Sequence, residues 1–300
     1  MRAQPQVKLT GSFRLRDALH LGLELRIWVA FCVTILALFC ARVSQTHALH
    51  PGNNGLPFHV FAVVFFSTLA LYNLDGTLDA AVRAGGMGRR VHLALTAFSA
   101  MMLLWFARQL PPLALGFTFL GFILCAIYAV PLAWGGTPRA LKAIPGIKGP
   151  FIGAAVATGV IWVPHLALVR PATPIVAVLT LVVGLYCTAN AVLFDVPDRD
   201  IDERSGVPTI MLTRGLTGAR RSCLSLCSAG ILLWPLGLGV VGQSAISPSQ
   251  LANLAALTCL GIVLTVASVR IQCTTPRSQV AWYVDGALLL PFVVQSLFGP

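Results

Sequence analysis

Apolar runs long enough to cross a lipid bilayer recur along this chain, and no other feature constrains its fold as strongly. A helix needs roughly 20 mostly apolar residues to cross the hydrocarbon core, and only helices and closed barrels can do so. Hydrophobic residues make up 57% of the 300 positions and charged residues only 10%, unlike soluble domains. We therefore predict an all-α, polytopic membrane protein with nine transmembrane helices, near residues 25–43, 57–74, 91–108, 112–133, 150–169, 173–194, 221–241, 250–269 and 279–298.

The spans are expected to form a single unit. No linker, low-complexity tract or run of like charge divides the chain, so we predict one membrane-embedded domain over residues 1–300. Residues 1–23 contain basic side chains but no apolar segment followed by a small-residue cleavage site. We expect them to form a cytoplasmic N-terminal segment, and the first span to remain as an anchor.

Basic residues are distributed unevenly between the two sides of this topology. If successive loops alternate between the sides, all of the 21 lysines and arginines except Arg42, Arg108 and Arg170 fall on the side of the N-terminus. The positive-inside rule then predicts a cytoplasmic N-terminus and, with nine spans, an external C-terminus, and we expect a bacterial cytoplasmic (inner) membrane. The net charge of +11 is not arranged as a basic stripe with interleaved aromatic residues, so nucleic acid is not an expected partner.

Acidic residues gather at two places on the predicted cytoplasmic side. Asp75 and Asp79 follow the second span, and half of the ten acidic residues lie between positions 195 and 203, after the sixth span. In helical segments, Asp75 and Asp79 would share one face, and so would Asp195, Asp198 and Asp202. Like charges this close repel and require a compensating cation. Mg²⁺, which bridges carboxylates and phosphates, is the ion we expect at these five metal-ligating and catalytic candidates.

The loop between the fourth and fifth spans supplies bases that suit the same interpretation. Arg139, Lys142 and Lys148 lie between proline-bounded apolar turns, in a stretch that predicts a short helix capping the membrane surface. These cations can bind a diphosphate. Two simpler explanations stay open: the acidic run could be a solvated loop balanced by Arg199 and Arg204, and the loop bases could reflect topology alone.

Aspartate-rich loops, diphosphate-binding bases and an apolar interior together suggest a polyprenyl diphosphate as substrate. Its tail would lie in the bundle or in membrane lipid while Mg²⁺ holds its head group. The metal would stabilise the departing diphosphate and leave an allylic, cation-like carbon for an acceptor. Cytoplasmic loops closing over the site would exclude water.

Two stretches carry a resemblance to a known family. "NAVLFDVPDRDIDERSGVPTIML" (190–212) resembles the second aspartate motif of the UbiA-type intramembrane prenyltransferases. "IYAVPLAW" with "LKAIPGIKGPFIG" is similar to the family's loop after its fourth helix, with Tyr128, Lys142 and Lys148 at matching positions. The resemblance implies a nine-helix bundle with cytoplasmic cap loops that opens laterally to lipid, and Mg²⁺-dependent transfer of an isoprenoid group from its diphosphate.

The resemblance also extends the candidate site. It places Asn190 in the second motif, and we add Asn190 and Arg83 to the expected diphosphate-binding residues. Tyr72, Asn73 and Tyr128 are expected to contact the acceptor or the prenyl tail. Asp285, in the last span, is similar to an acidic position of the family, and we expect a structural role for it, such as a hydrogen bond between helices.

The first motif departs from the family pattern. The usual form is N-x-x-x-D-x-x-x-D, but Leu71 stands in the place of the asparagine, and Gly76 stands where the family often has arginine. Tyr72, Asp75 and Asp79 instead match a reduced Y-x-x-D-x-x-x-D form.

This departure leaves alternatives to the prenyltransferase hypothesis. One is a catalytically degenerate, isoprenoid-binding membrane protein, and a transporter is another. A third is an enzyme like the CDP-alcohol phosphotransferases, because "DGTLDAAVR" is vaguely similar to the opening of their motif. That motif needs two further aspartates within about a dozen residues, but the next acid after Asp79 is Asp195. The sequence leaves the acceptor open among aromatic acids, quinone precursors, porphyrins and sugar phosphates.

Overall fold

The structure is a computed structural model, and it describes residues 26–46, 57–82, 86–130, 132–134, 137–240 and 247–298. The predicted N-terminal segment 1–23 and Arg83 lie outside these ranges. Asp79 and Arg139 are described by their backbone only.

Nine helices in the described part of the chain are long and apolar enough to cross a membrane, which confirms the predicted all-α, nine-span architecture. Eight of them are single elements, and the ninth crossing is built from α11 (Arg277–Val280), the π-helical turn η2 (Ala281–Asp285) and α12 (Leu290–Phe298). The eight are α2 (Ile27–Thr46), α3 (Phe58–Val82), α4 (Gly86–Ala107), α5 (Pro112–Ala129), α6 (Lys148–Ala167), α7 (Pro174–Phe194), α9 (Ile210–Val240) and α10 (Pro248–Arg270).

Local sequence explains where several helices begin and bend. Proline occupies the first position of α5, α7 and α10, where its missing N–H leaves no helical hydrogen bond unmade. Ser247 and Gln250 add a reciprocal capping box at the start of α10. Gly215 interrupts α9 with a φ of 66°, a left-handed conformation that glycine adopts without steric cost.

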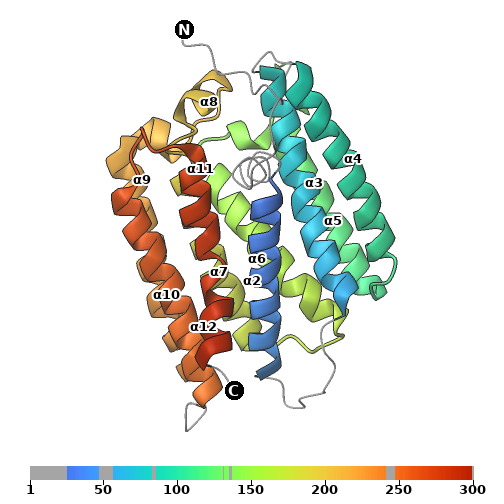
Figure 1. The fold of residues 1–300 in the computed structure, drawn as a ribbon, viewed down its shortest axis with the longest axis vertical. Coiled ribbons are helices and arrows are strands. Elements are labelled where there is room, and N and C mark those ends of the chain that lie inside the picture. The colour runs from blue at the N-terminus through green and yellow to red at the C-terminus, as the bar shows by residue number, and fades with distance from the viewer. Residues whose placement is uncertain are drawn as a thin grey trace, which may run out of the picture.

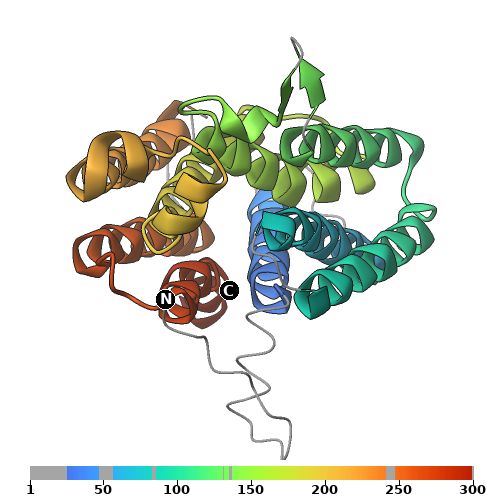
Figure 2. The ribbon, with the colours of Figure 1, turned by 90° about the horizontal axis from the view of Figure 1, so that it is seen from above.

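The helices stand side by side, with α6 and α7 in the middle of the bundle (Figure 1). Seen from above, α3, α4 and α5 lie on one side of the central helices, and α9 to α12 lie on the other (Figure 2). Small residues permit the close contact of α6 with α7: a Cβ atom added at Gly153 would lie only 2.0 Å from Thr188 Oγ1. Such small-residue contacts are typical of helix pairs in membranes.

Short cap elements carry most of the candidate site residues. A two-stranded hairpin, β1 (Leu132–Trp134) and β2 (Thr137–Arg139), precedes the 3-10 turn η1 (Leu141–Ala143). The short helix predicted for this loop is therefore a single turn preceded by a hairpin. Helix α8 (Arg199–Arg204) follows α7 at the upper end of the bundle in Figure 1.

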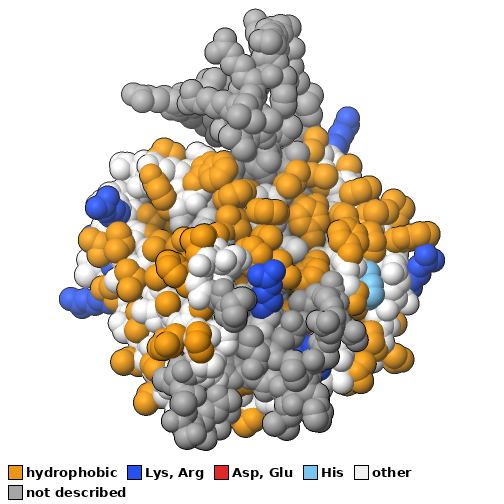
Figure 3. Space-filling view, turned by 60° about the horizontal axis from the view of Figure 1, so that its bottom comes forward, with side chains coloured by type: hydrophobic (Ala, Val, Ile, Leu, Met, Phe, Trp, Pro, Cys, Tyr) orange, Lys and Arg blue, Asp and Glu red, His pale blue; other side chains and the backbone are white. Residues whose placement is uncertain are grey.

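The opposite end is different in character. In Figure 3, which turns this end toward the viewer, the described side chains are largely hydrophobic, with isolated basic groups and no acidic group visible. Many large apolar side chains on the outside of the helices are also exposed, among them Leu113, Leu236 and Phe298. A bundle of this kind is expected to present such side chains to lipid.

Candidate functional site

Lys148 connects the two ends of the second aspartate motif. Its ammonium Nζ lies 2.9 Å from Asp195 Oδ1 and 2.9 Å from both carboxylate oxygens of Asp202. Both carboxylates are nearly buried, with 3% of the Asp195 side chain and 9% of the Asp202 side chain exposed. Lys148 is the first residue of α6, so one cation joins α6 to the end of α7 and to α8.

The backbone after α7 explains why these two acids converge. Helix α7 ends at Phe194, a turn of four residues that includes Pro197 follows, and the chain resumes as α8 at Arg199. Proline disfavours a helical conformation of the residue before it, which promotes this break. The sequence predicted that the three aspartates share one face of a helix. This prediction is wrong, because the helix is interrupted between them. Asp195 and Asp202 meet at Lys148, whereas Asp198 Oδ2 pairs with the guanidinium of Arg277 at 3.1 Å.

The first motif supplies a second pairing of carboxylate and lysine. Asp75, in the part of α3 that continues beyond the predicted span, lies with Oδ1 2.6 Å from the Lys142 ammonium in η1. Asp75 also interacts electrostatically with Lys148 and Arg26. The structure therefore brings Asp75, Lys142 and Lys148 into one neighbourhood with the second motif.

Tyr128 lies between the two motifs. Its ring stacks on that of Phe151, with centroids 4.3 Å apart. Its hydroxyl interacts electrostatically with Lys148 and with carboxylates of both motifs. The hydroxyl is buried and makes no hydrogen bond to any described part of the chain, so its hydrogen-bonding capacity is left unused there.

Burial governs the acid–base properties of the second motif. It raises the pKa of the Asp202 carboxyl to about 7, although the Lys148 ammonium opposes the shift. Burial raises the pKa of Asp195 as well, again against the effect of Lys148. One lysine does not fully compensate two buried carboxylates, and an additional cation would stabilise their charged forms.

Two buried carboxylate oxygens, of Asp195 and Asp198, lack a hydrogen bond and could bind a cation. The contact of Asp195 Oδ1 with Lys148 lacks the angles of a hydrogen bond, and Asp198 Oδ1 is likewise buried without a hydrogen bond from any described group. Carboxylate oxygens are the donors that Mg²⁺ prefers. Among the described side chains, which do not include that of Asp79, no three acidic, histidine or cysteine groups converge closely enough to form a complete metal centre. The donor set therefore suits Mg²⁺ in kind, with further oxygens to come from a ligand or from water.

Asn73 lies at the contact of α3 with α4. Its side chain is fully buried, donates to Leu69 O and lies 2.7 Å from His92 Nδ1 of α4. These contacts hold the Asn73 side chain between α3 and α4, and its expected contact with acceptor or tail stays a prediction. The same histidine accounts for Gly76, because a Cβ atom there would lie 3.2 Å from the imidazole.

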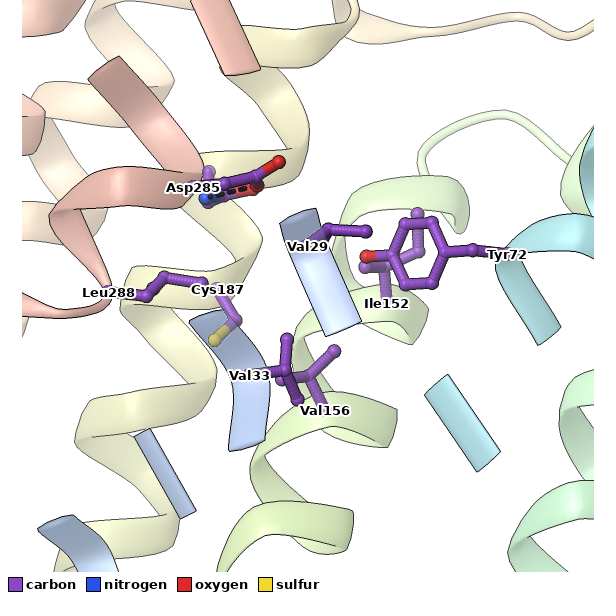
Figure 4. Close-up of a pocket in the computed structure, with 9 residues that line it drawn as sticks. Val29, Val33, Tyr72, Ile152, Val156, Cys187, Asp285 and Leu288 are labelled. Atoms are coloured by element: carbon purple, nitrogen blue, oxygen red, sulfur yellow. Dashed lines mark hydrogen bonds between the residues drawn. The ribbon is translucent and has the colours of Figure 1, made fainter. Parts of the chain in front are cut away.

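Asn190 and Tyr72 line a cavity below the charged groups. The amide of Asn190 donates to Val284 O at 3.1 Å and approaches Asp285 Oδ1 at 3.4 Å, which ties α7 to the last crossing. The expected hydrogen bond of Asp285 between helices is thus present. Figure 4 shows Tyr72 and Asp285 on opposite sides of the cavity.

Sequence reasoning did not identify Arg277 or His92 as neighbours of the site. Arg277 pairs with Asp198, and His92 contacts Asn73. Neither residue lies in a motif, so only the tertiary structure places them beside Asp198 and Asn73.

Comparisons with known proteins agree with this architecture. The sequence matches the UbiA prenyltransferase family over residues 77–290. A UbiA homolog from Archaeoglobus fulgidus, solved bound to GPP and Mg²⁺, is similar in fold with a TM-score of 0.63 at 12% identity, covering 92% of this chain and 99% of that chain. The apo structure of a UbiA homolog from Aeropyrum pernix K1 is similar with a TM-score of 0.60 at 16% identity, covering 88% and 98%. A digeranylgeranylglyceryl phosphate synthase structure is similar with a TM-score of 0.54 at 15% identity, covering 91% and 98%. No curated protein matches the sequence.

Proposed function

Because the chain belongs to the UbiA prenyltransferase family, we propose that it transfers a polyprenyl group from its diphosphate to an acceptor within the membrane, with Mg²⁺ as cofactor. The observation that carries the proposal is the alternation of carboxylates and lysines at one end of the bundle. Lys148 joins Asp195 and Asp202, and Lys142 joins Asp75. The similar Archaeoglobus homologue was solved with GPP and Mg²⁺ and also with DMAPP and Mg²⁺.

The two lysines are the proposed diphosphate ligands. The ammonium of lysine has three N–H donors on a flexible side chain, so it can change its hydrogen-bond partner from a carboxylate oxygen to a phosphate oxygen without a large rearrangement. The carboxylates that the lysines now neutralise, together with Asp198 and Asp79, would then hold Mg²⁺. Arg83 and Arg139 stay proposed auxiliary bases. Asn190 lies lower, against Asp285, so we assign it to the cavity rather than to the diphosphate.

The chain's own groups would promote cleavage of the bond between C1 of the prenyl group and the diphosphate oxygen. When bound, Mg²⁺ neutralises negative charge that develops on the diphosphate. Lys142 and Lys148 stabilise the same charge from the protein side. The Tyr128 hydroxyl, buried and without a hydrogen bond to the described chain, would donate a hydrogen bond to a diphosphate oxygen. The apolar walls of the surrounding helices keep water from the allylic carbon.

The proposed chemistry takes place at the membrane surface. The nine apolar helices among the residues that the structure describes, together with the family, make this a multi-pass membrane protein. The positive-inside pattern supports a cytoplasmic site, a cytoplasmic N-terminus and an external C-terminus. A bacterial cytoplasmic membrane is the proposed location.

A turnover assay tests the proposal. The full-length protein in lipid nanodiscs is incubated with Mg²⁺, radiolabelled geranylgeranyl diphosphate and a lipid extract of native membranes, and prenylated product and released diphosphate are measured. We expect turnover that Asp198→Asn lowers at least a hundredfold. Asp200→Asn is the matched control, because Asp200 is exposed in α8, and it should retain wild-type turnover.

Two outcomes would redirect the proposal. Binding of prenyl diphosphates without turnover, over several chain lengths, would favour a degenerate isoprenoid-binding protein, as Leu71 in the first motif suggests. Unchanged turnover of Asp198→Asn would show that the metal is held elsewhere.

A further inference from the structure

A narrow cavity lies beneath the proposed diphosphate site. Its lining is apolar except for Tyr72, Asn190, Cys187 and Asp285. Tyr72 precedes Asp75 by three residues in α3, and Asn190 precedes Asp195 by five in α7. At 1.5 Å of rise per residue, the cavity lies about 5–8 Å deeper in the bundle than the carboxylates.

Asp285 is the one ionisable carboxylate among the cavity's lining residues. The residue is only 5% exposed. Burying a carboxyl group in a membrane span costs free energy, and residues of this kind usually have a function. It ends the π-helical turn η2, and such turns occur frequently at functional sites. Asn190 approaches one of its oxygens, and Figure 4 draws no hydrogen bond between the other oxygen and the side chains that line the cavity.

The cavity differs in charge from the site above it. No lysine, arginine or histidine lines it in the described structure. Arg26 and Arg277 act on Asp285 electrostatically without lining the cavity, and Arg277 already pairs with Asp198. An anionic group entering the cavity would lose its hydration and find no cation there, at a high cost in free energy.

Size gives an independent constraint. The cavity has room for about one water-sized group between its lining side chains. A hydroxyl has this size and can donate a hydrogen bond to a carboxylate oxygen. A carboxylate group has two oxygens and no proton to donate at neutral pH.

We propose that this cavity binds the nucleophilic group of the acceptor, that the group is an uncharged hydroxyl, and that Asp285 is the residue that receives its hydrogen bond. The proposal rests on the proposed prenyltransferase function. In the transfer, the C1–O bond to the diphosphate breaks with its electron pair leaving on the diphosphate. The hydroxyl oxygen forms the new bond to C1, and its proton passes along the hydrogen bond to the Asp285 carboxylate. Acceptors whose reacting end is a carboxylate are excluded.

Binding of a matched pair of probes tests the inference without requiring turnover. 2-Naphthol and 2-naphthoate share one ring system, and each carries one polar group, a hydroxyl or a carboxylate. Equilibrium dialysis at pH 7.5 against protein in nanodiscs, corrected with empty nanodiscs, should show 2-naphthol bound at least ~10-fold more tightly than 2-naphthoate. Asp285→Leu should weaken 2-naphthol binding at least fivefold, and Asp285→Asn, which keeps an acceptor oxygen, should weaken it less.

Controls separate this inference from the proposed function and from misfolding. Gln295→Leu changes another buried polar residue of the last crossing that does not line the cavity, and it should leave 2-naphthol binding unchanged. The Asp285→Leu variant should still bind geranylgeranyl diphosphate. If the wild-type protein does not bind this diphosphate, the proposed function is wrong, but the comparison of 2-naphthol with 2-naphthoate can still be made. Equal binding of the two probes, or undiminished 2-naphthol binding by a folded Asp285→Leu variant, would overturn the inference.

Discussion

Replacing Lys148 with methionine should destabilise the protein more than any other single loss of charge at the site. The change removes an ammonium that lies 2.9 Å from carboxylates of both Asp195 and Asp202. Breaking a buried ion pair by removing one partner typically costs about 3–5 kcal/mol. Because the pKa of Asp202 is already raised to about 7, proton uptake relieves part of the cost in the variant, and we expect the lower end, about 3 kcal/mol.

Lys142→Met is the matched comparison. Its partner Asp75 has a 42% exposed side chain, so solvent screens the pair, and its loss should cost about 0–1 kcal/mol. On the usual scaling, the Lys148 variant should melt on the order of 5–10 °C below wild type. The Lys142 variant should melt within a few degrees of wild type.

Thermal unfolding in detergent can be followed with a dye that fluoresces on reaction with thiols. The assay suits this chain because Cys32, Cys40, Cys187, Cys223 and Cys227 are free and buried. Neutralising the stranded acids in a triple variant, Lys148→Met with Asp195→Asn and Asp202→Asn, should recover most of the lost stability. Equal melting of the two lysine variants, or no recovery in the triple variant, would refute the reasoning.

Three further predictions concern packing and metal dependence. Gly153→Val should abolish folded protein, measured as monodisperse yield, because its Cβ would lie 2.0 Å from Thr188 Oγ1, whereas Gly159→Val, with nothing within 4 Å, should fold normally. Gly76→Ala should lower the free energy of unfolding by about 1–3 kcal/mol, because the added Cβ would lie 3.2 Å from the His92 imidazole. Adding His92→Ala should restore the stability, and a Gly76→Ala variant as stable as wild type would contradict this packing. Removing divalent cations with EDTA should stop prenyl transfer, and added Mg²⁺ should restore it; turnover that persists in EDTA would exclude the metal role.

The membrane spans could be predicted closely because hydropathy alone selects them. Their ends were less accessible where polar residues continue a helix beyond the hydrocarbon core. Helix α3 extends to Val82 and so carries Asp75, and α9 begins at Ile210, eleven residues before its predicted span. In both places the helix is longer than the apolar run, since a helix can continue through charged residues beyond the hydrocarbon core.

The candidate site could be predicted in composition but not in pairing. The motifs identified Asp195, Asp202 and Lys148, yet their convergence depends on how the start of α6 meets the end of α7. The orientation of Asn73 was also inaccessible, because α3 is apolar around most of its circumference and its sequence does not show which face meets α4.

The most direct test of the central claim is electron–nuclear double resonance of Mn²⁺ bound in place of Mg²⁺, with a non-hydrolysable thio analogue of geranylgeranyl diphosphate. If the aspartate motifs and lysines form one metal–diphosphate site, the Mn²⁺ signal will show coupling to phosphorus, and Asp195→Asn with Asp202→Asn will remove that coupling. Bound Mn²⁺ without phosphorus coupling, or coupling that is unchanged in this variant, would contradict the account.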